Sequence, residues 1–362
     1  MERKKVLVAM SGGVDSSVAA ALLMKEYEVI GATMKLFTND DISLSRDKTC
    51  CSLDDVEDAR LAAFKLGIAH YVFQFGERFR ECVIDRFNNA YINGLTPNPC
   101  IDCNRFLKFD ALLNRALELR QDYIATGHYV RRSFDEETGR YRLLKGRDES
   151  KDQSYVLYGM TQEQLSRTLF PIGELTKEET RSVASSLGLM NAGKPDSQDI
   201  CFVPDADYAA FIEGFTGKHF PKGSFIDSSG RVLGEHSGII RYTIGQRKGL
   251  GIALGKPAYV ISKDIAANTV TLGSNEELFS DTAFADDVNW LSIPFTEQPM
   301  RVEAKVRYNM KAQPATLYPL SESSIKVVFD SPQRAVTPGQ ALVCYSGEVL
   351  LCGGTIPLEK NK

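Results

Sequence analysis

The chain has 362 residues, 43% hydrophobic and 25% charged, an ordinary composition for a soluble protein of two or three domains. Its net charge of −4 argues against a protein that binds nucleic acid over its whole surface. The apolar run at the N-terminus is too short for a signal peptide, and no stretch approaches the roughly 20 apolar residues of a membrane span. We therefore expect a cytoplasmic protein without membrane contact, whose eight cysteines are mostly reduced thiols.

The first half of the chain alternates short apolar runs with helical patterns, a repetition typical of a parallel, doubly wound α/β sheet. Residues 131–146 are predicted to form a hairpin, because two strand-like arms flank a Thr-Gly turn. Two helices are expected between residues 162 and 190, and Thr176 is a suitable N-cap for the second. The expected strands and helices before them cover 5–10, 16–25, 28–37, 54–67, 70–75, 77–94, 105–119 and 122–130.

The pattern changes after about residue 206. Short strands are then broken by Ser, Asn and Gly turns, and strict alternation from residue 301 is typical of a small barrel. We predict three domains: a catalytic α/β domain (1–206), a small β-rich central domain (207–282) and a C-terminal β-barrel (283–362). The segment 241–256 of the central domain is basic and glycine-rich, which suits either phosphate contact or a solvated loop.

The sequence SGGVDSS, residues 11–17, connects the first expected strand to the first expected helix. Unpaired N–H groups at a helix N-terminus attract phosphate oxygens, glycines allow the backbone to come close, and serines add hydroxyl donors. The loop lacks the lysine that holds a γ-phosphate in G-x-x-x-x-G-K-[ST] loops. The pattern therefore predicts a phosphate site that serves a reaction other than simple γ-phosphoryl transfer.

This loop resembles the pyrophosphate loop of the ATP pyrophosphatases, which cleave ATP between the α- and β-phosphates and transfer AMP to a carbonyl-type oxygen. Within that family the chain resembles the tRNA-specific 2-thiouridylases over nearly its whole length. The similarity rests on AMSGGVDSSVAA, TPNPC-x-x-CNRFLKF, ATGHYVR, KDQSYVLY, KPDSQDICFV, YTIGQRKGLGI, VRYN and TPGQALVCY, in this order. The resemblance implies a tRNA-uridine 2-sulfurtransferase that replaces the C2 oxygen of a wobble uridine with sulfur.

ATP and Mg²⁺ are the cofactors that the resemblance implies. Met34 would contact the adenosine, although a methionine in a strand is usually a core residue, and Gly127 would let the nucleotide come close. Asp15 would orient the metal and the phosphates, or would instead cap the helix that follows. The residues lining the phosphates would be Ala9, Met10, Ser11, Gly12, Gly13, Val14, Asp15 and Ser16.

Two cysteines carry the sulfur chemistry that the resemblance implies. Cys201 would bear a persulfide and Cys103 would be the second catalytic thiol, with a Cys103–Cys201 disulfide as the spent state. The residues themselves favour a reactive Cys103, because it precedes a helix and has Arg105 and Lys108 nearby. Whether sulfur attacks as persulfide or as hydrogensulfide is left open, and so is an inert, buried Cys201.

Cys100 departs from some relatives, which have Asp at this position. A thiol cannot simply replace that carboxylate, so the catalytic base is unassigned. Cys100, Cys103 and Cys201 are alternatively the ligands of a [4Fe-4S] cluster with one open iron. A zinc site has less support, because the sequence has no second close Cys/His pair.

The resemblance also implies contacts with tRNA, of the Lys, Glu and Gln acceptors, and a persulfide donor such as a cysteine desulfurase or a sulfur-relay protein. His128 alone would more often be a structural histidine, whereas Tyr308 could stack on a base and Arg307 could pair with phosphate. The target base would face Asn98, Pro99 and Cys100, the anticodon region His128, Lys151, Asp152 and Gln153, and the tRNA body Arg307, Tyr308 and Gln340.

Two other functions compete with this interpretation. A pyrophosphate-loop ligase that joins an amine to a small molecule would explain the glycine loop, but not the two cysteines or the β-rich C-terminal half. A non-enzymatic protein that binds RNA or carries a cluster would explain the thiols, but would not convert ATP to AMP.

Overall fold

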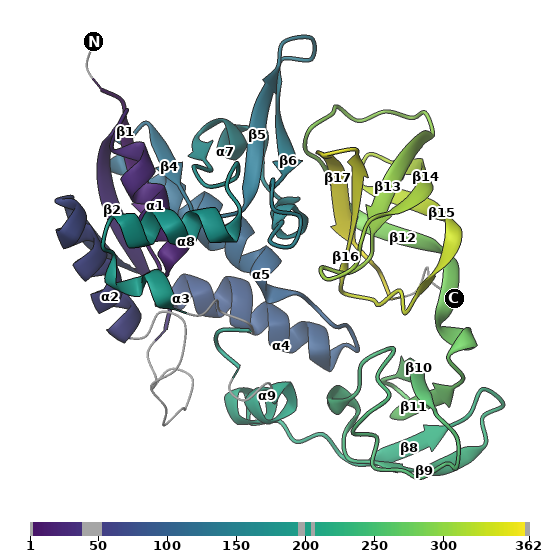
Figure 1. Cartoon of the computed structure of the whole chain (residues 1–362). Helices are drawn as coiled ribbons and strands as arrows, with labels where there is room; N and C mark the ends of the chain where they lie inside the picture. Colours follow the sequence, from purple (N-terminus) through teal and green to yellow (C-terminus); the bar gives the residue numbers. More distant parts are fainter. Residues whose placement is uncertain (1–2, 38–52, 195–199, 204–206, 359–362) are drawn as a thin grey trace.

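The computed structural model describes residues 3–37, 53–194, 200–203 and 207–358. It contains an N-terminal α/β domain, a small central β domain and a C-terminal barrel (Figure 1). The described part of the chain contains no helix long and apolar enough to cross a membrane.

The N-terminal domain is built on a five-stranded parallel sheet with the order β3-β2-β1-β4-β7. Both faces of the sheet are covered: Val6 and Val8 of β1 belong to the hydrophobic core on one face and Leu7 to the core on the other. The predicted doubly wound sheet is therefore confirmed. The strands are β1 (Lys5–Ala9), β2 (Glu28–Lys35), β3 (His70–Gln74), β4 (Tyr123–Ala125) and β7 (Thr168–Leu169).

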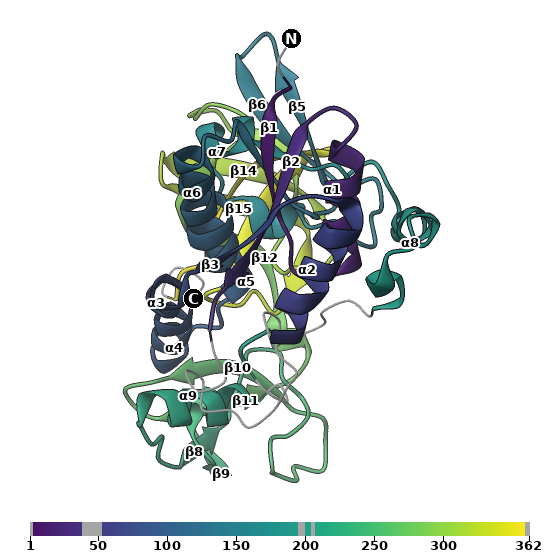
Figure 2. The same cartoon turned by 90° about the vertical axis from the view of Figure 1, so that its left-hand side faces the viewer.

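Figure 2 shows the sheet between two groups of helices. One face is covered by α1 (Val14–Leu23), α2 (Leu53–Leu66) and α8 (Lys177–Ser186). The other is covered by α3 (Gly76–Phe79), η1 (Arg80–Ile84), α4 (Asp85–Ile92), α5 (Pro99–Asp102), η2 (Cys103–Ala111) and α6 (Leu112–Glu118). The short helices η3 (Ser154–Leu157), α7 (Gln162–Ser166) and η4 (Met190–Gly193) complete the domain.

The start of α8 agrees with the prediction from sequence. The Thr176 side chain accepts a hydrogen bond from the Glu179 backbone N–H, and the Glu179 carboxylate accepts one from the Thr176 backbone N–H. This reciprocal capping box fixes Lys177 as the first residue of the helix.

The predicted hairpin is also confirmed, as β5 (Val130–Asp135) and β6 (Arg140–Lys145). The hairpin also pairs with another domain: Leu143 and Leu144 of β6 pair with β17 of the C-terminal barrel. Backbone hydrogen bonding therefore connects the first domain to the third.

The central domain contains α9 (Tyr208–Thr216) and a four-stranded sheet with the order β10-β11-β8-β9. Its strands are β8 (Gly223–Ile226), β9 (Val232–His236), β10 (Tyr259–Asp264) and β11 (Thr269–Gly273), with the short helices η6 (Ile239–Arg241) and η7 (Glu276–Leu278).

The C-terminal domain is a closed six-stranded barrel, because β12 pairs with β17 as well as with β15. Apolar residues of its strands form a core of their own. The predicted C-terminal barrel is therefore confirmed. Its strands are β12 (Phe279–Trp290), β13 (Met300–Lys305), β14 (Gln313–Ser321), β15 (Ser324–Arg334), β16 (Ala341–Ser346) and β17 (Val349–Thr355).

Candidate active site

The phosphate loop runs from the end of β1 to the start of α1. Gly12 has a φ of +75°, and a Cβ on it would lie 2.4 Å from the Asp55 carbonyl oxygen, so only glycine fits there. Gly13 is the N-cap residue and has no side chain to occupy the first N–H groups of α1. Those groups suit an anion.

Two of the three loop serines, Ser16 and Ser17, have a local role in this structure. The Ser16 hydroxyl accepts from the Ser11 N–H at 3.2 Å and donates to the Gly13 carbonyl at 3.1 Å, and Ser17 donates to the same carbonyl. These bonds hold the loop in shape. Donation by these hydroxyls to a phosphate stays a prediction.

The loop lies at the topological switch point of the sheet, because β1 has β2 on one side and β4 on the other. In open α/β sheets, ligands bind in the crevice outside the carboxyl ends of such strands. Gly127, just after β4, packs against the first turn of α1: a Cβ on it would lie 2.7 Å from the Ser16 backbone N. Gly127 therefore lets the end of β4 approach the loop itself.

Asp15 does not cap α1, contrary to one of the two sequence interpretations. Its oxygens each lie 2.8 Å from the Lys177 Nζ, and Oδ1 accepts a hydrogen bond from the Tyr129 hydroxyl at 2.8 Å. Lys177 and Tyr129 are functional candidates that the sequence analysis missed. The only hint was the absence of a lysine from the loop, and nothing local shows that one arrives from α8, 162 residues away.

Two residues connect the loop to the segment that leads toward Cys201. Asn191 donates from Nδ2 to the Gly12 carbonyl and to Ser17 Oγ, both at 3.0 Å. Lys194 pairs at 2.7 Å with Asp55, beside the loop, and at 2.7 Å with Asp58. These contacts were also missed, because they join residues more than 130 positions apart.

The predicted adenosine contact at Met34 is buried in this structure. Met34 is 9% exposed and Met10 is 2% exposed, and both belong to hydrophobic cores. This burial supports the core interpretation of Met34, and its contact with adenosine stays a prediction.

The first cysteine segment forms the start of a long helical stretch. Asn98 caps α5 by accepting from the Cys100 N–H at 3.1 Å, and Pro99 occupies the first helical turn. Cys100 is exposed, whereas Cys103 is half-buried and begins the π-helical segment η2. π-helical turns are often found at functional sites.

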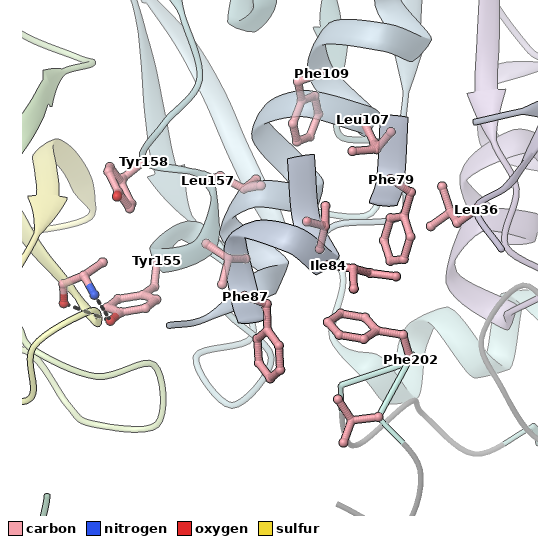
Figure 3. Close-up of a cluster of buried hydrophobic side chains, with 14 of the residues drawn as sticks. Leu36, Phe79, Ile84, Phe87, Leu107, Phe109, Tyr155, Leu157, Tyr158 and Phe202 are labelled. Carbon is pink, nitrogen blue, oxygen red and sulfur yellow. Dashed lines mark hydrogen bonds between the residues drawn. The ribbon is translucent and has the colours of Figure 1, made fainter. Parts of the chain in front are cut away.

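The second cysteine is anchored by its neighbour. Phe202 is 1% exposed and makes edge-on contacts with Phe79 and Phe87, with ring centroids 5.7 and 5.3 Å apart. Figure 3 shows these rings in the core that also contains Leu107, one turn beyond Cys103. Cys103 and Cys201 both pack against this core, which continues into the central domain and the barrel.

Asp102, between the two cysteines of the first segment, was not singled out by sequence. Burial raises the pKa of its carboxyl group, and the neighbouring Arg86, 3.3 Å away, lowers it in part. A carboxyl group with a raised pKa beside a thiol is a candidate acid or base.

The predicted RNA-contacting residues near the first domain have partners within the protein. His128 is 6% exposed, its Nδ1 lies 2.8 Å from Thr126 Oγ1, and its Nε2 lies 3.4 Å from Lys108 Nζ. Asp152 accepts hydrogen bonds from Gly146 and Ser154, and Gln153 accepts one from the Tyr129 N–H. Lys151 is half-buried, and its contact with tRNA stays a prediction.

The predicted RNA-contacting residues of the barrel join the domains together. Arg307 donates to the carbonyl oxygens of Ile244 and Ala335, and Gln340 donates to that of Thr96 at 2.6 Å. Burial raises the pKa of Tyr308, and the nearby Asp152 and Cys100 raise it further.

Of these residues, Cys100 and Asp152 lie near Tyr308 of the barrel, and Gln340 contacts Thr96, just before Asn98, whereas the contacts of His128 are with Lys108 and Thr126 of its own domain. Contact of any of them with RNA stays a prediction.

The residues described here do not assemble a metal centre. No three His, Cys, Asp or Glu side chains within the described ranges lie close enough together to hold a metal ion. The arrangement of Cys100, Cys103 and Cys201 therefore does not fit a [4Fe-4S] cluster in this conformation.

The fold and the loop define a HUP-type nucleotide-binding domain followed by two β domains. The family of the tRNA methyl transferase HUP domain matches residues 4–205, that of the tRNA methyl transferase PRC-barrel domain 209–274, and that of the aminomethyltransferase β-barrel domain 280–356.

Proteins called tRNA-specific 2-thiouridylase MnmA are similar over almost the whole chain. The one from Acetivibrio thermocellus is 54% identical over 358 residues, 98% of this chain and 100% of the relative. The one from Clostridioides difficile is 51% identical over 354 residues, 98% of each chain. The chain belongs to the tRNA-specific 2-thiouridylase family.

Proposed function

We propose that this protein adenylates the C2 oxygen of a wobble uridine in tRNA and then replaces that oxygen with sulfur from a cysteine persulfide. The observation that carries the proposal is that Cys103 begins η2 of the domain that holds the phosphate loop, and that Cys201 precedes Phe202, whose ring packs on Phe79 and Phe87 of the same domain. One domain thus contains both parts that the reaction requires, an ATP-activating loop and a pair of thiols.

Adenylation makes the oxygen able to leave. The C2 oxygen attacks the α-phosphorus of ATP and pyrophosphate departs, while the N–H groups at the start of α1 stabilise the phosphate charge. Asp15 is the residue that would hold Mg²⁺, which would supply further charge neutralisation. Its carboxylate fits such a role once Lys177 has moved from it.

Sulfur transfer then ends in a disulfide. The outer sulfur of the Cys201 persulfide attacks C2 and AMP leaves, after which the Cys103 thiolate attacks the Cys201 sulfur and releases the thiolated base. In the other order, the Cys103 thiolate first attacks the Cys201 sulfur of the persulfide and releases hydrogensulfide, which then attacks C2 and displaces AMP. Both routes form one S–S bond between Cys103 and Cys201, which a reductant must open before the next cycle.

The proposal includes the partners of the reaction. The substrates are ATP and tRNA of the Lys, Glu and Gln acceptors in the cytoplasm. A cysteine desulfurase or a sulfur-relay protein would recharge Cys201. Asn98, Pro99 and Cys100 are proposed to face the target base.

Substitution of the two thiols tests the proposal. Cys103→Ser and Cys201→Ser should each abolish the incorporation of sulfur into tRNA, because serine neither carries a persulfide nor forms a disulfide. Cys82→Ser is the matched control, since Cys82 is half-buried and packs against the same core. Wild-type incorporation of sulfur into tRNA by both Cys103→Ser and Cys201→Ser would refute the proposal.

The rival functions give different products. The names of two matching domain families refer to methyl transfer, so the mass of the modified nucleoside should be checked for an added methyl group as well as for sulfur. A ligase that acts on a small molecule would release AMP without tRNA. AMP release that requires unmodified tRNA favours the thiolation chemistry.

A further inference from the structure

The phosphate loop lacks a lysine of its own, yet the structure brings one to it. Lys177 places its Nζ 2.8 Å from both oxygens of Asp15, which lies in the first turn of α1. The Lys177 side chain is 10% exposed and that of Asp15 is 29% exposed. A shielded cation therefore lies beside the N–H groups that the fold presents to phosphate.

Local structure holds the lysine in this place. The capping box of Thr176 and Glu179 makes Lys177 the first residue of α8, and its backbone N–H donates to Asp148 Oδ2 at 3.0 Å. The ammonium group also lies 5.7 Å from the centre of the Tyr129 ring. The backbone is thus fixed from two sides, while the side chain ends at the loop.

The negative charge of bound phosphate would favour separation of the Lys177–Asp15 ion pair. Asp15 is the acidic residue of the loop, and an uncompensated carboxylate there would repel the phosphates of ATP. An ammonium 2.8 Å away can turn from the carboxylate to a phosphate oxygen by rotation of its flexible side chain. The carboxylate is then left to a divalent cation.

We propose that Lys177 is the pyrophosphate-binding cation of this site and that Asp15 holds its side chain in place until phosphate arrives. This inference rests on the proposed function, since it assigns a residue to the ATP step. Lys177 contacts the β- and γ-phosphates and stabilises the charge that develops on pyrophosphate as it leaves.

Calorimetric titration with inorganic pyrophosphate, in EDTA, tests the proposal without any tRNA chemistry. Lys177→Met should bind pyrophosphate about 10- to 100-fold more weakly than wild type, because a charge-assisted hydrogen bond is lost. Lys177→Arg should recover part of the affinity. Lys25→Met, which removes an exposed lysine of the same domain, is the matched control and should bind like wild type.

The Asp15→Asn variant tests whether Lys177 binds phosphate or only forms a structural ion pair with Asp15. In EDTA this variant should bind pyrophosphate at least as tightly as wild type, because Lys177 no longer has to leave a carboxylate. A merely structural pair predicts that Asp15→Asn and Lys177→Met weaken binding alike. The double variant removes both charges, so it avoids an unpaired carboxylate, and it should still bind more weakly than Asp15→Asn because the ammonium group is missing.

Three results would overturn the inference: no binding of pyrophosphate by wild type, equal binding by Lys177→Met, or equal losses in the two single variants. Assay of sulfur incorporation by the same wild-type preparation keeps the proposed function separate. Pyrophosphate binding with the expected pattern but no thiolated tRNA would refute the thiolation and leave the phosphate contact standing.

Discussion

Gly127 and Ser16 touch through their backbones, and a Cβ on Gly127 would lie 2.7 Å from the Ser16 N and 2.8 Å from the Asp15 carbonyl carbon. These atoms belong to the first turn of α1 and cannot move without moving the phosphate loop. The contact joins the ends of β1 and β4 at the switch point, where the nucleotide is expected.

Gly127→Ala is therefore expected to damage both the fold and the site. The added methyl group should destabilise the protein by about 1–3 kcal/mol through overpacking, and it should raise the KM for ATP. Chemical denaturation and AMP-release kinetics measure the two effects. Gly214→Ala is the control: it lies in α9, a Cβ there meets nothing within 4 Å, and the helix should gain up to about 1 kcal/mol. Equal stabilities of the two variants would contradict the close packing.

His128 predicts a pH dependence of stability. Burial, and next the Lys108 ammonium, lower the pKa of His128 well below its usual 6.5. Because a lysine ammonium only donates, the His128 Nε2 must accept, which leaves the proton on Nδ1 for Thr126. Below about pH 6.5 this histidine binds a proton in the unfolded chain but stays neutral in the folded chain. The free energy of unfolding therefore falls as pH falls.

His128→Gln should flatten this dependence. The slope of the unfolding free energy between pH 7 and 5 should decrease by up to about 1.4 kcal/mol per pH unit relative to wild type. His219→Gln is the matched control, because that side chain is 90% exposed. Urea titrations at several pH values decide the question, and identical slopes in wild type and His128→Gln would refute the assignment.

Arg307 tests the connection between domains. Its guanidinium donates to Ile244 of the central domain and to Ala335 and Thr337 of the barrel, and burial lowers its pKa. Arg307→Lys should cost about 1–3 kcal/mol, because one ammonium cannot reproduce this planar set of bonds. Arg301→Lys should cost under about 1 kcal/mol, since its partner Asp330 is solvent-exposed. Similar melting temperatures for both variants would argue against this role for Arg307.

Cys100 distinguishes two-thiol chemistry from cluster chemistry. Cys100→Ser is expected to keep sulfur transfer, because the proposed disulfide involves only Cys103 and Cys201. Anaerobic purification followed by a visible absorption spectrum gives the independent observation. A brown, iron-containing wild type that loses colour and activity together in Cys100→Ser would establish the cluster instead.

Local signals were sufficient for much of the fold. The β-then-α repetition predicted the doubly wound sheet, the Thr-Gly turn predicted the hairpin, and Thr176 predicted the start of α8. Each of these depends on neighbouring residues, because periodicity and capping act over a few positions. The path of the hairpin into the barrel depends on pairing with β17, which no local pattern encodes.

The candidate site likewise has features set by neighbouring residues and features set by tertiary contacts. The shape of the phosphate loop follows from Gly12 and Gly13, which the sequence shows directly. Lys177 and Tyr129 meet Asp15 only through the tertiary fold, so the motif gave no sign of either. Asp102 was overlooked because its raised pKa comes from burial, which one sequence does not display.

We propose that this protein transfers sulfur to tRNA in a reaction that consumes ATP. Mass spectrometry of nucleosides, after incubation of wild type with ATP, Mg²⁺, a sulfide source and unmodified tRNA, tests it most directly. We expect 2-thiouridine at the wobble position, formed together with AMP and absent when ATP is omitted. Unmodified uridine, or thiolation that proceeds without ATP, would contradict it.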